Sequence, residues 1–182
     1  MTVAIALVAT MYTVRNESPG DHEAVHAVTV AAFAASEFGH SGEAELVERI
    51  RSSNDSHVSL VAVDGDEVIG HILFSPATIQ TADGVLEGMG LGPMSVEPGR
   101  QRQGIGKVLI EAGIQQLNSC PFIMVFGHAD YYPRFGFVPA SEYGIRHAFE
   151  GMPQELFFIR WSEEPRRDGV AFYHAAFGPQ TG

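Results

Sequence analysis

The stretch 99-GRQRQGIGKVLI-110 places three glycines and three basic side chains in front of an apolar helical pattern. The helix predicted over 104–118 has no Ser, Thr or Asp to cap it, so its first backbone N–H groups lack partners. Gly104 and Gly106 carry no Cβ, and an outside group can therefore approach the main chain closely. The dipole of the helix and the nearby cations favour an anion here, so the stretch predicts a diphosphate site. The cations are Arg100, Arg102 and Lys107.

Two other phosphate-binding loops do not fit this stretch. The Walker motif requires a glycine where Gln101 stands and a hydroxyl residue where Val108 stands. The dinucleotide motif GxGxxG requires a third glycine in place of Leu109. Taken alone, the glycines are also compatible with a tight surface turn whose charges are solvated.

The elements around this helix predict an α/β fold. A strand over 85–96 precedes the helix and an apolar strand over 121–127 follows it, which predicts a crossover with the two strands parallel. Helices are expected at 18–33 and 43–52 from apolar residues at helical spacing. The other predicted strands are 12–17, 57–64, 67–79, 137–140, 155–161 and 169–177. The order predicts a single three-layer domain, a central mixed twisted sheet with helices on both faces.

Composition excludes several classes of function. The chain has 182 residues and a net charge of −11, which argues against general binding to nucleic acid or to an anionic membrane. Its one cysteine, Cys120, fits a reducing compartment, and a cytoplasmic location is expected. The apolar run in residues 1–11 is too short to span a bilayer and is interpreted as an N-terminal extension.

Two motifs carry a family resemblance. The stretch 91-LGPMSVEPGRQRQGIGKVLI-110 resembles the acetyl-CoA-binding motif of the GNAT superfamily of N-acetyltransferases, whose signature falls on residues 101–106. The stretch 131-YYPRFGF-137 is similar to the second landmark of that family. The resemblance is to a branch of small bacterial acetyltransferases with the patterns LGPxxVxP and GHxxYYxRFGF. It covers residues 12–139, and 140–182 would supply C-terminal strands of the same domain.

The resemblance implies direct transfer of an acetyl group from acetyl-CoA to an amine of a small molecule, protein or peptide. It places Tyr132 as the acid that protonates the leaving thiolate, with Tyr131 the neighbour most easily confused with it. Glu87 is the first candidate for the base that deprotonates the amine, and His71, His128 or water are alternatives. The residues implied in cofactor binding are Met94, Ser95, Val96, Gln101, Arg102, Gln103, Gly104, Ile105, Gly106, Lys107, Tyr131 and Phe135.

Other interpretations remain open from the sequence. A protein with this fold could sense acyl-CoA without turnover. The segment 22-HEAVH-26 matches the HExxH pattern of zinc peptidases, but no third ligand follows at an obvious spacing, so no metal is expected. The aromatic C-terminal part suggests a homodimer. The acceptor pocket is expected to involve the segment 33–42, the strand 85–91 and the C-terminal part.

Overall fold

The computed structural model describes residues 12–34, 42–165 and 167–181, so the predicted extension over 1–11 lies outside the described residues. The helices are α1 (His22–Ala34), α2 (Glu43–Ser52) and α3 (Ile105–Gln116). The strands are β1 (Thr13–Asn16), β2 (Val58–Asp64), β3 (Glu67–Thr81), β4 (Gly84–Val96), β5 (Phe122–Phe126), β6 (Val138–Pro139), β7 (Ile145–His147), β8 (Phe157–Trp161) and β9 (Gly169–Phe172). These strands form one sheet in the order β1-β2-β3-β4-β5-β8-β6, with β9 paired to β3 and to β7.

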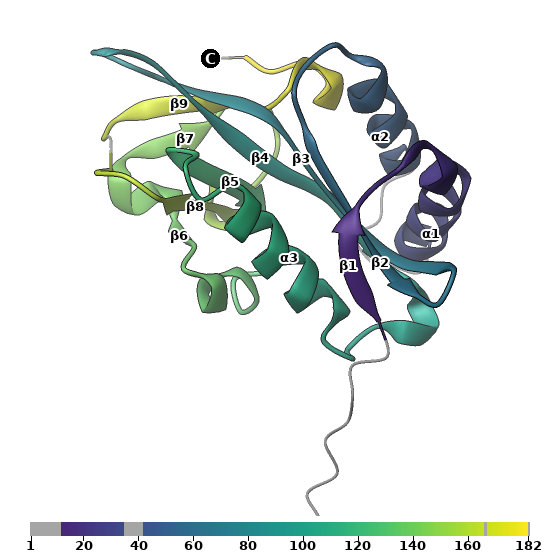
Figure 1. The fold of residues 1–182 in the computed structure, drawn as a ribbon. Coiled ribbons are helices and arrows are strands. Elements are labelled where there is room, and N and C mark those ends of the chain that lie inside the picture. Colours follow the sequence, from purple (N-terminus) through teal and green to yellow (C-terminus); the bar gives the residue numbers. More distant parts are fainter. Residues whose placement is uncertain (1–11, 35–41, 166, 182) are drawn as a thin grey trace, which may run out of the picture.

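The three layers predicted from the sequence are confirmed. Figure 1 shows α3 on one side of the sheet and α1 and α2 on the other. The apolar stripe of α3, with Ile105 and Leu109 buried, packs on the inner strands. Val47 and Ile50 of α2 pack against β2 and β3 on the opposite face. Helices therefore cover both faces, as the alternation of strand and helix in the sequence requires.

Strands β4 and β5 pair only briefly. They are parallel, as predicted, but the paired register ends where Leu91 lies opposite Val125. Between Leu91 and Met94 the register of β4 against β3 also shifts, at Gly92 and Pro93. Proline has no N–H for a ladder, so it fits a place where pairing lapses. The remainder of β4 runs on to Val96 while β5 ends at Phe126, and the two strands leave an opening between them.

The C-terminal strands bring distant residues to this opening. β8 pairs antiparallel with β5, and β9 pairs antiparallel with the far end of β3. The chain leaving β9 places the ring of Tyr173 on β4, where a Cβ added at Gly90 would lie 2.6 Å from ring carbons of Tyr173. The short strand β7 was not predicted, because three residues give too little pattern to recognise.

Candidate active site

A cavity of about 660 Å³ runs along the start of α3. The end of β4 forms one wall, the glycine-containing loop and the first turn of α3 form another, and Tyr131 and Arg134 close the side. The described residues that line this first cavity are Ala32, Phe33, Met94, Ser95, Val96, Gln101, Arg102, Gly104, Ile105, Gly106, Lys107, Tyr131 and Arg134. Most of the cofactor residues expected from the sequence are thus brought together in one place.

The helix begins as the sequence predicts, without a side-chain cap. Gly104 is the N-cap residue in the left-handed conformation, with φ of 89°, and as a glycine it supplies no side-chain hydrogen bond to cap the helix. A left-handed residue costs little at glycine and about 1 kcal/mol or more at most other residues. The free N–H groups and the positive end of the helix dipole therefore face an open cavity, which suits a bound anion.

Some side chains of the glycine-containing loop line the first cavity, and others bind elsewhere on the protein surface. Arg102 and Lys107 line the cavity, as does Gln101, whose amide donates to the Val96 carbonyl oxygen at 3.2 Å. Gln103 instead donates to the carbonyl oxygen of Gly99 and is not among the cavity residues. Arg100 forms an ion pair at 2.9 Å with Asp64, the last residue of β2, a partner that the local sequence does not reveal. Two cations of the predicted three therefore remain at the cavity.

Tyr131 lies over the first turn of α3. A Cβ added at Gly106 would lie 2.9 Å from the hydroxyl oxygen of Tyr131, so the glycine admits this phenol. The Arg134 guanidinium lies over the Tyr131 ring, 5.1 Å from its centroid. Burial raises the pKa of Tyr131 above its ordinary value of 10. Phe135 packs on the Tyr131 ring, with ring centroids 5.4 Å apart, and does not itself line the cavity.

A second cavity, of about 770 Å³, adjoins the first. It opens between the splayed ends of β4 and β5, from Leu91 to Met94 on β4 and from Phe126, the last residue of β5, to His128 after it. The two cavities share lining residues, so they meet at the place where the strands part. The shared residues are Phe33, Met94, Gln101, Arg102 and Tyr131.

Tyr132 lies in the second cavity. Its side chain is largely buried, and a Cβ at Gly127 would overlap its ring, so the glycine after β5 makes room for it. Burial raises the pKa of Tyr132 well above 10, with a smaller contribution from Tyr131. The phenol therefore keeps its proton throughout the neutral range, in the form that donates.

The candidate bases take different positions. Glu87 is exposed on β4 opposite Thr78, on the part of the strand away from the splay, and is not among the described residues lining either cavity. His128, an alternative base from the sequence, follows β5 and lines the second cavity. Glu43, the first residue of α2, also lines it. Glu43 was not identified from the sequence, because only the packing of α2 brings it near β4.

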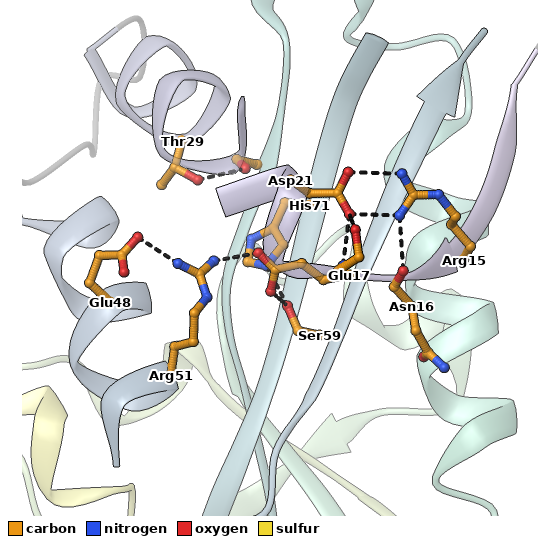
Figure 2. A network of polar contacts seen from close by, with 11 residues as sticks. Arg15, Asn16, Glu17, Asp21, Thr29, Glu48, Arg51, Ser59 and His71 are labelled. Atoms are coloured by element: carbon orange, nitrogen blue, oxygen red, sulfur yellow. Dashed lines mark hydrogen bonds and ion pairs between the residues drawn. The ribbon is translucent and has the colours of Figure 1, made fainter. Parts of the chain in front are cut away.

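His71 belongs to a buried polar network rather than to a cavity. Figure 2 shows His71 beside Glu17, Ser59 and Arg51. The Ser59 hydroxyl donates to the Glu17 carboxylate, so His71 Nε2–H donates to Ser59 Oγ at 2.8 Å. Nδ1 then carries the lone pair, and it is buried without a hydrogen-bond partner among the residues that the structure describes. Burial, helped by the Arg51 charge, lowers the pKa of His71 to about 3.

The structure also bears on the possible metal site at His22 and His26 and on membrane-spanning helices. His22 and His26 both lie on α1, His26 exposed. Within the parts of the chain that the structure describes, no group of three or more His, Cys, Asp or Glu side chains could hold a metal ion. None of the described helices combines the length and the apolar character needed to cross a membrane.

Known proteins resemble this chain in sequence and in structure. The model of the acetyltransferase (GNAT) domain family matches residues 13–140. The uncharacterized N-acetyltransferase YjhQ of Escherichia coli is 39% identical over 109 residues, which span 57% of this chain and 60% of YjhQ. The uncharacterized N-acetyltransferase YhbS of the same organism is 28% identical over 169 residues, 90% of this chain and 97% of YhbS.

Solved structures extend the likeness to the whole fold. A GNAT family acetyltransferase from Brucella melitensis, solved in complex with acetyl-CoA, superposes with a TM-score of 0.76 at 34% identity. The match covers 92% of this chain and 98% of the Brucella chain. The structure of Escherichia coli YhbS in complex with CoA gives a TM-score of 0.81 at 26% identity, covering 94% of this chain and 95% of YhbS. With its sheet, its splayed strands and its uncapped helix, the chain belongs to the GNAT family of acetyltransferases.

Proposed function

We propose that this chain binds acetyl-CoA along the first cavity and transfers the acetyl group directly to an amine held in the second. The observation that carries the proposal is the meeting of the two cavities at Met94 and Tyr131, where β4 and β5 part. A donor in one cavity and an acceptor in the other would react at that junction without a covalent enzyme intermediate. The complexes of the two GNAT relatives with acetyl-CoA and CoA support the choice of donor.

The first cavity fits coenzyme A at both of its ends. The uncapped N–H groups at Gly104–Gly106, with Arg102 and Lys107 beside them, suit the diphosphate. The stretch from Met94 to Val96 has no β5 strand opposite it, so its backbone N–H groups on that side are available to the pantetheine arm and the thioester carbonyl. One well-aimed backbone donor at a carbonyl that gains negative charge is worth about 10²–10³ in rate.

Bound acetyl-CoA supplies an acetyl group activated as a thioester. The acceptor nitrogen must lose a proton, the new C–N bond forms as the C–S bond breaks, and the sulfur takes up a proton. We assign the proton donor as Tyr132, which lines the second cavity in its protonated form. His128 and Glu43, which line the same cavity, are the groups placed to receive the proton of the amine directly or through water.

Calorimetry and a thiol-release assay test this function. The purified protein should bind CoA, and it should release free thiol from acetyl-CoA faster when amines are present. Binding of CoA with no acceleration by any amine in a broad screen would indicate an acyl-CoA sensor instead. Absence of CoA binding would remove the proposal entirely.

A further inference from the structure

The second cavity has an aromatic wall built from three separate parts of the chain. One ring comes from α1, three from β5 and the turn after it, and two from the segment after β9. The rings are Phe33, Phe126, Tyr131, Tyr132, Tyr173 and Phe177. Neighbouring members touch, because ring centroids are 4.9 Å apart for Tyr173 and Phe177 and 5.7 Å for Phe126 and Tyr173. Phe126, Tyr173 and Phe177 therefore form one continuous aromatic surface, and Tyr131 and Tyr132 form a second touching pair, with ring centroids 5.3 Å apart.

The C-terminal part of this wall is held firmly in place. The Tyr173 ring rests on the bare backbone of Gly90, and the side chain is only 6% exposed. Burial raises the pKa of Tyr173 well above 10, with the Tyr132 phenol adding to the rise and the Phe126 backbone opposing it. Tyr173 is thus a neutral, immobilised surface for an occupant of the cavity, not a titrating group.

The charges around the cavity are unevenly placed. Arg102 stands at the end shared with the first cavity, where the proposed diphosphate lies. Glu43 is the one acidic residue among the described residues that line the second cavity. His128 lines the cavity on the β5 side. Among the described residues, Glu43 is thus the negative side chain that an occupant next to the aromatic wall meets, and the positive end of the occupant is attracted to Glu43 and to the faces of the rings.

We propose that the acceptor is a small primary amine carried on an aromatic or similarly sized apolar body, with its ammonium group directed to Glu43 before deprotonation. This inference rests on the proposed acetyl transfer. The cavity size lies within the range of about 300–1,000 Å³ usual for small-molecule pockets. An amine that also carries a carboxylate next to its nitrogen would meet repulsion from Glu43. A polyamine without an apolar body would leave the aromatic wall uncovered.

Three acceptors separate these chemistries. With acetyl-CoA as donor, kcat/KM for 2-phenylethylamine is expected to exceed that for L-phenylalanine by about tenfold or more, the factor that corresponds to one ion pair. It is expected to exceed kcat/KM for putrescine by about tenfold or more as well, the factor that corresponds to one apolar contact surface. Equal or better use of L-phenylalanine or putrescine would overturn the acceptor class while acetyl transfer itself would stand. A protein that does not bind CoA would overturn both.

Variants of the cavity test the residues. Glu43→Gln is expected to raise KM for 2-phenylethylamine about tenfold while KM for acetyl-CoA stays the same. Glu45→Gln on the exposed side of the same helix is the matched control and should change neither. Phe177→Ala should lower kcat/KM for 2-phenylethylamine but not for putrescine, and Phe177→Leu should restore part of it. An unchanged KM for the amine in Glu43→Gln would contradict the assignment.

A binding experiment covers the case in which turnover is slow for all three amines. 2-Phenylethylamine is titrated into the protein saturated with CoA, and the heat of binding is measured. Binding that weakens in Glu43→Gln, with the thermal unfolding midpoint unchanged, supports the proposal. Failure of the amine to bind the CoA-saturated protein overturns it, whatever the turnover.

Discussion

The hydroxyl oxygen of Tyr131 lies 2.9 Å from the position that a Cβ on Gly106 would occupy. The glycine in the first turn of α3 therefore serves a neighbouring phenol as well as the ligand it was expected to admit. In Gly106→Ala the added methyl must push Tyr131 into the first cavity or away from it. We expect the affinity for CoA, measured by calorimetry, to fall about tenfold, as loss of roughly one good contact would cause.

The control for this substitution is Gly99→Ala in the same loop. A Cβ at Gly99 would meet no atom of the described residues within 4 Å, so the affinity for CoA should stay at its original value. An unchanged affinity in Gly106→Ala as well would show that the position of Tyr131 does not matter to the cofactor.

Charge at the helix start can be tested at Gly104. Aspartate and asparagine both tolerate the left-handed conformation better than other residues, and both can cap a helix. Gly104→Asp adds a negative charge where the diphosphate is proposed, whereas Gly104→Asn adds a side chain of the same shape. We expect the aspartate variant to bind CoA at least about tenfold more weakly than the asparagine variant, with similar thermal stability. Equal affinities would place the diphosphate elsewhere.

The assignment of Tyr132 as proton donor predicts that its substitution changes kcat but not the affinity for CoA. Tyr132→Phe removes only the hydroxyl group, so kcat should fall about 10²-fold or more while Kd for CoA stays similar. Tyr131→Phe is the contrasting variant: it alters the group over Gly106 and should affect Kd for CoA more than kcat. Steady-state kinetics with calorimetry distinguishes the two tyrosines. The reverse pattern would make Tyr131 the donor.

The sequence predicted the features of this site that arise from contiguous residues. The start of α3, the parallel pair β4 and β5, and the position of Arg102 and Lys107 beside the uncapped helix all follow from local pattern. Each depends on residues a few positions apart, where hydrogen-bonding and steric rules act directly.

Long-range packing accounts for the features that the sequence did not reveal. The alternation of side chains along a strand indicates on which face of the sheet Glu87 lies, but not where β4 separates from β5. That separation begins after Leu91. Arg100 was expected beside the phosphate, but its ion pair with Asp64 depends on the end of β2 lying near the loop. Glu43 and Phe177 reach one cavity only after α2 and the C-terminal segment have docked.

The rate of acetyl transfer should rise with pH and should not decline again in the mildly alkaline range. An alkylamine acceptor with a pKa of about 10.4 is mostly protonated at neutral pH, so kcat/KM should increase from pH 6 to about pH 9. Because burial raises the pKa of Tyr132 above 10, loss of its proton should not lower the rate below about pH 10. A decline that starts near pH 8 in the wild-type protein and disappears in Tyr132→Phe would contradict this environment for the phenol.

His71 predicts how stability depends on pH. Its pKa of about 3 in the folded protein lies below the ordinary 6.5, so between these values the unfolded chain binds a proton that the folded protein does not. Stability from this group is therefore complete above pH 6.5 and is lost as the pH falls toward 3, by up to about 1.4 kcal/mol per pH unit. Denaturant unfolding at pH 7 and pH 5 measures the loss. His71→Gln should flatten this dependence, and His26→Gln, on the exposed side of α1, should retain it. An equal slope in His71→Gln and the wild type would mean that other groups cause the acid sensitivity.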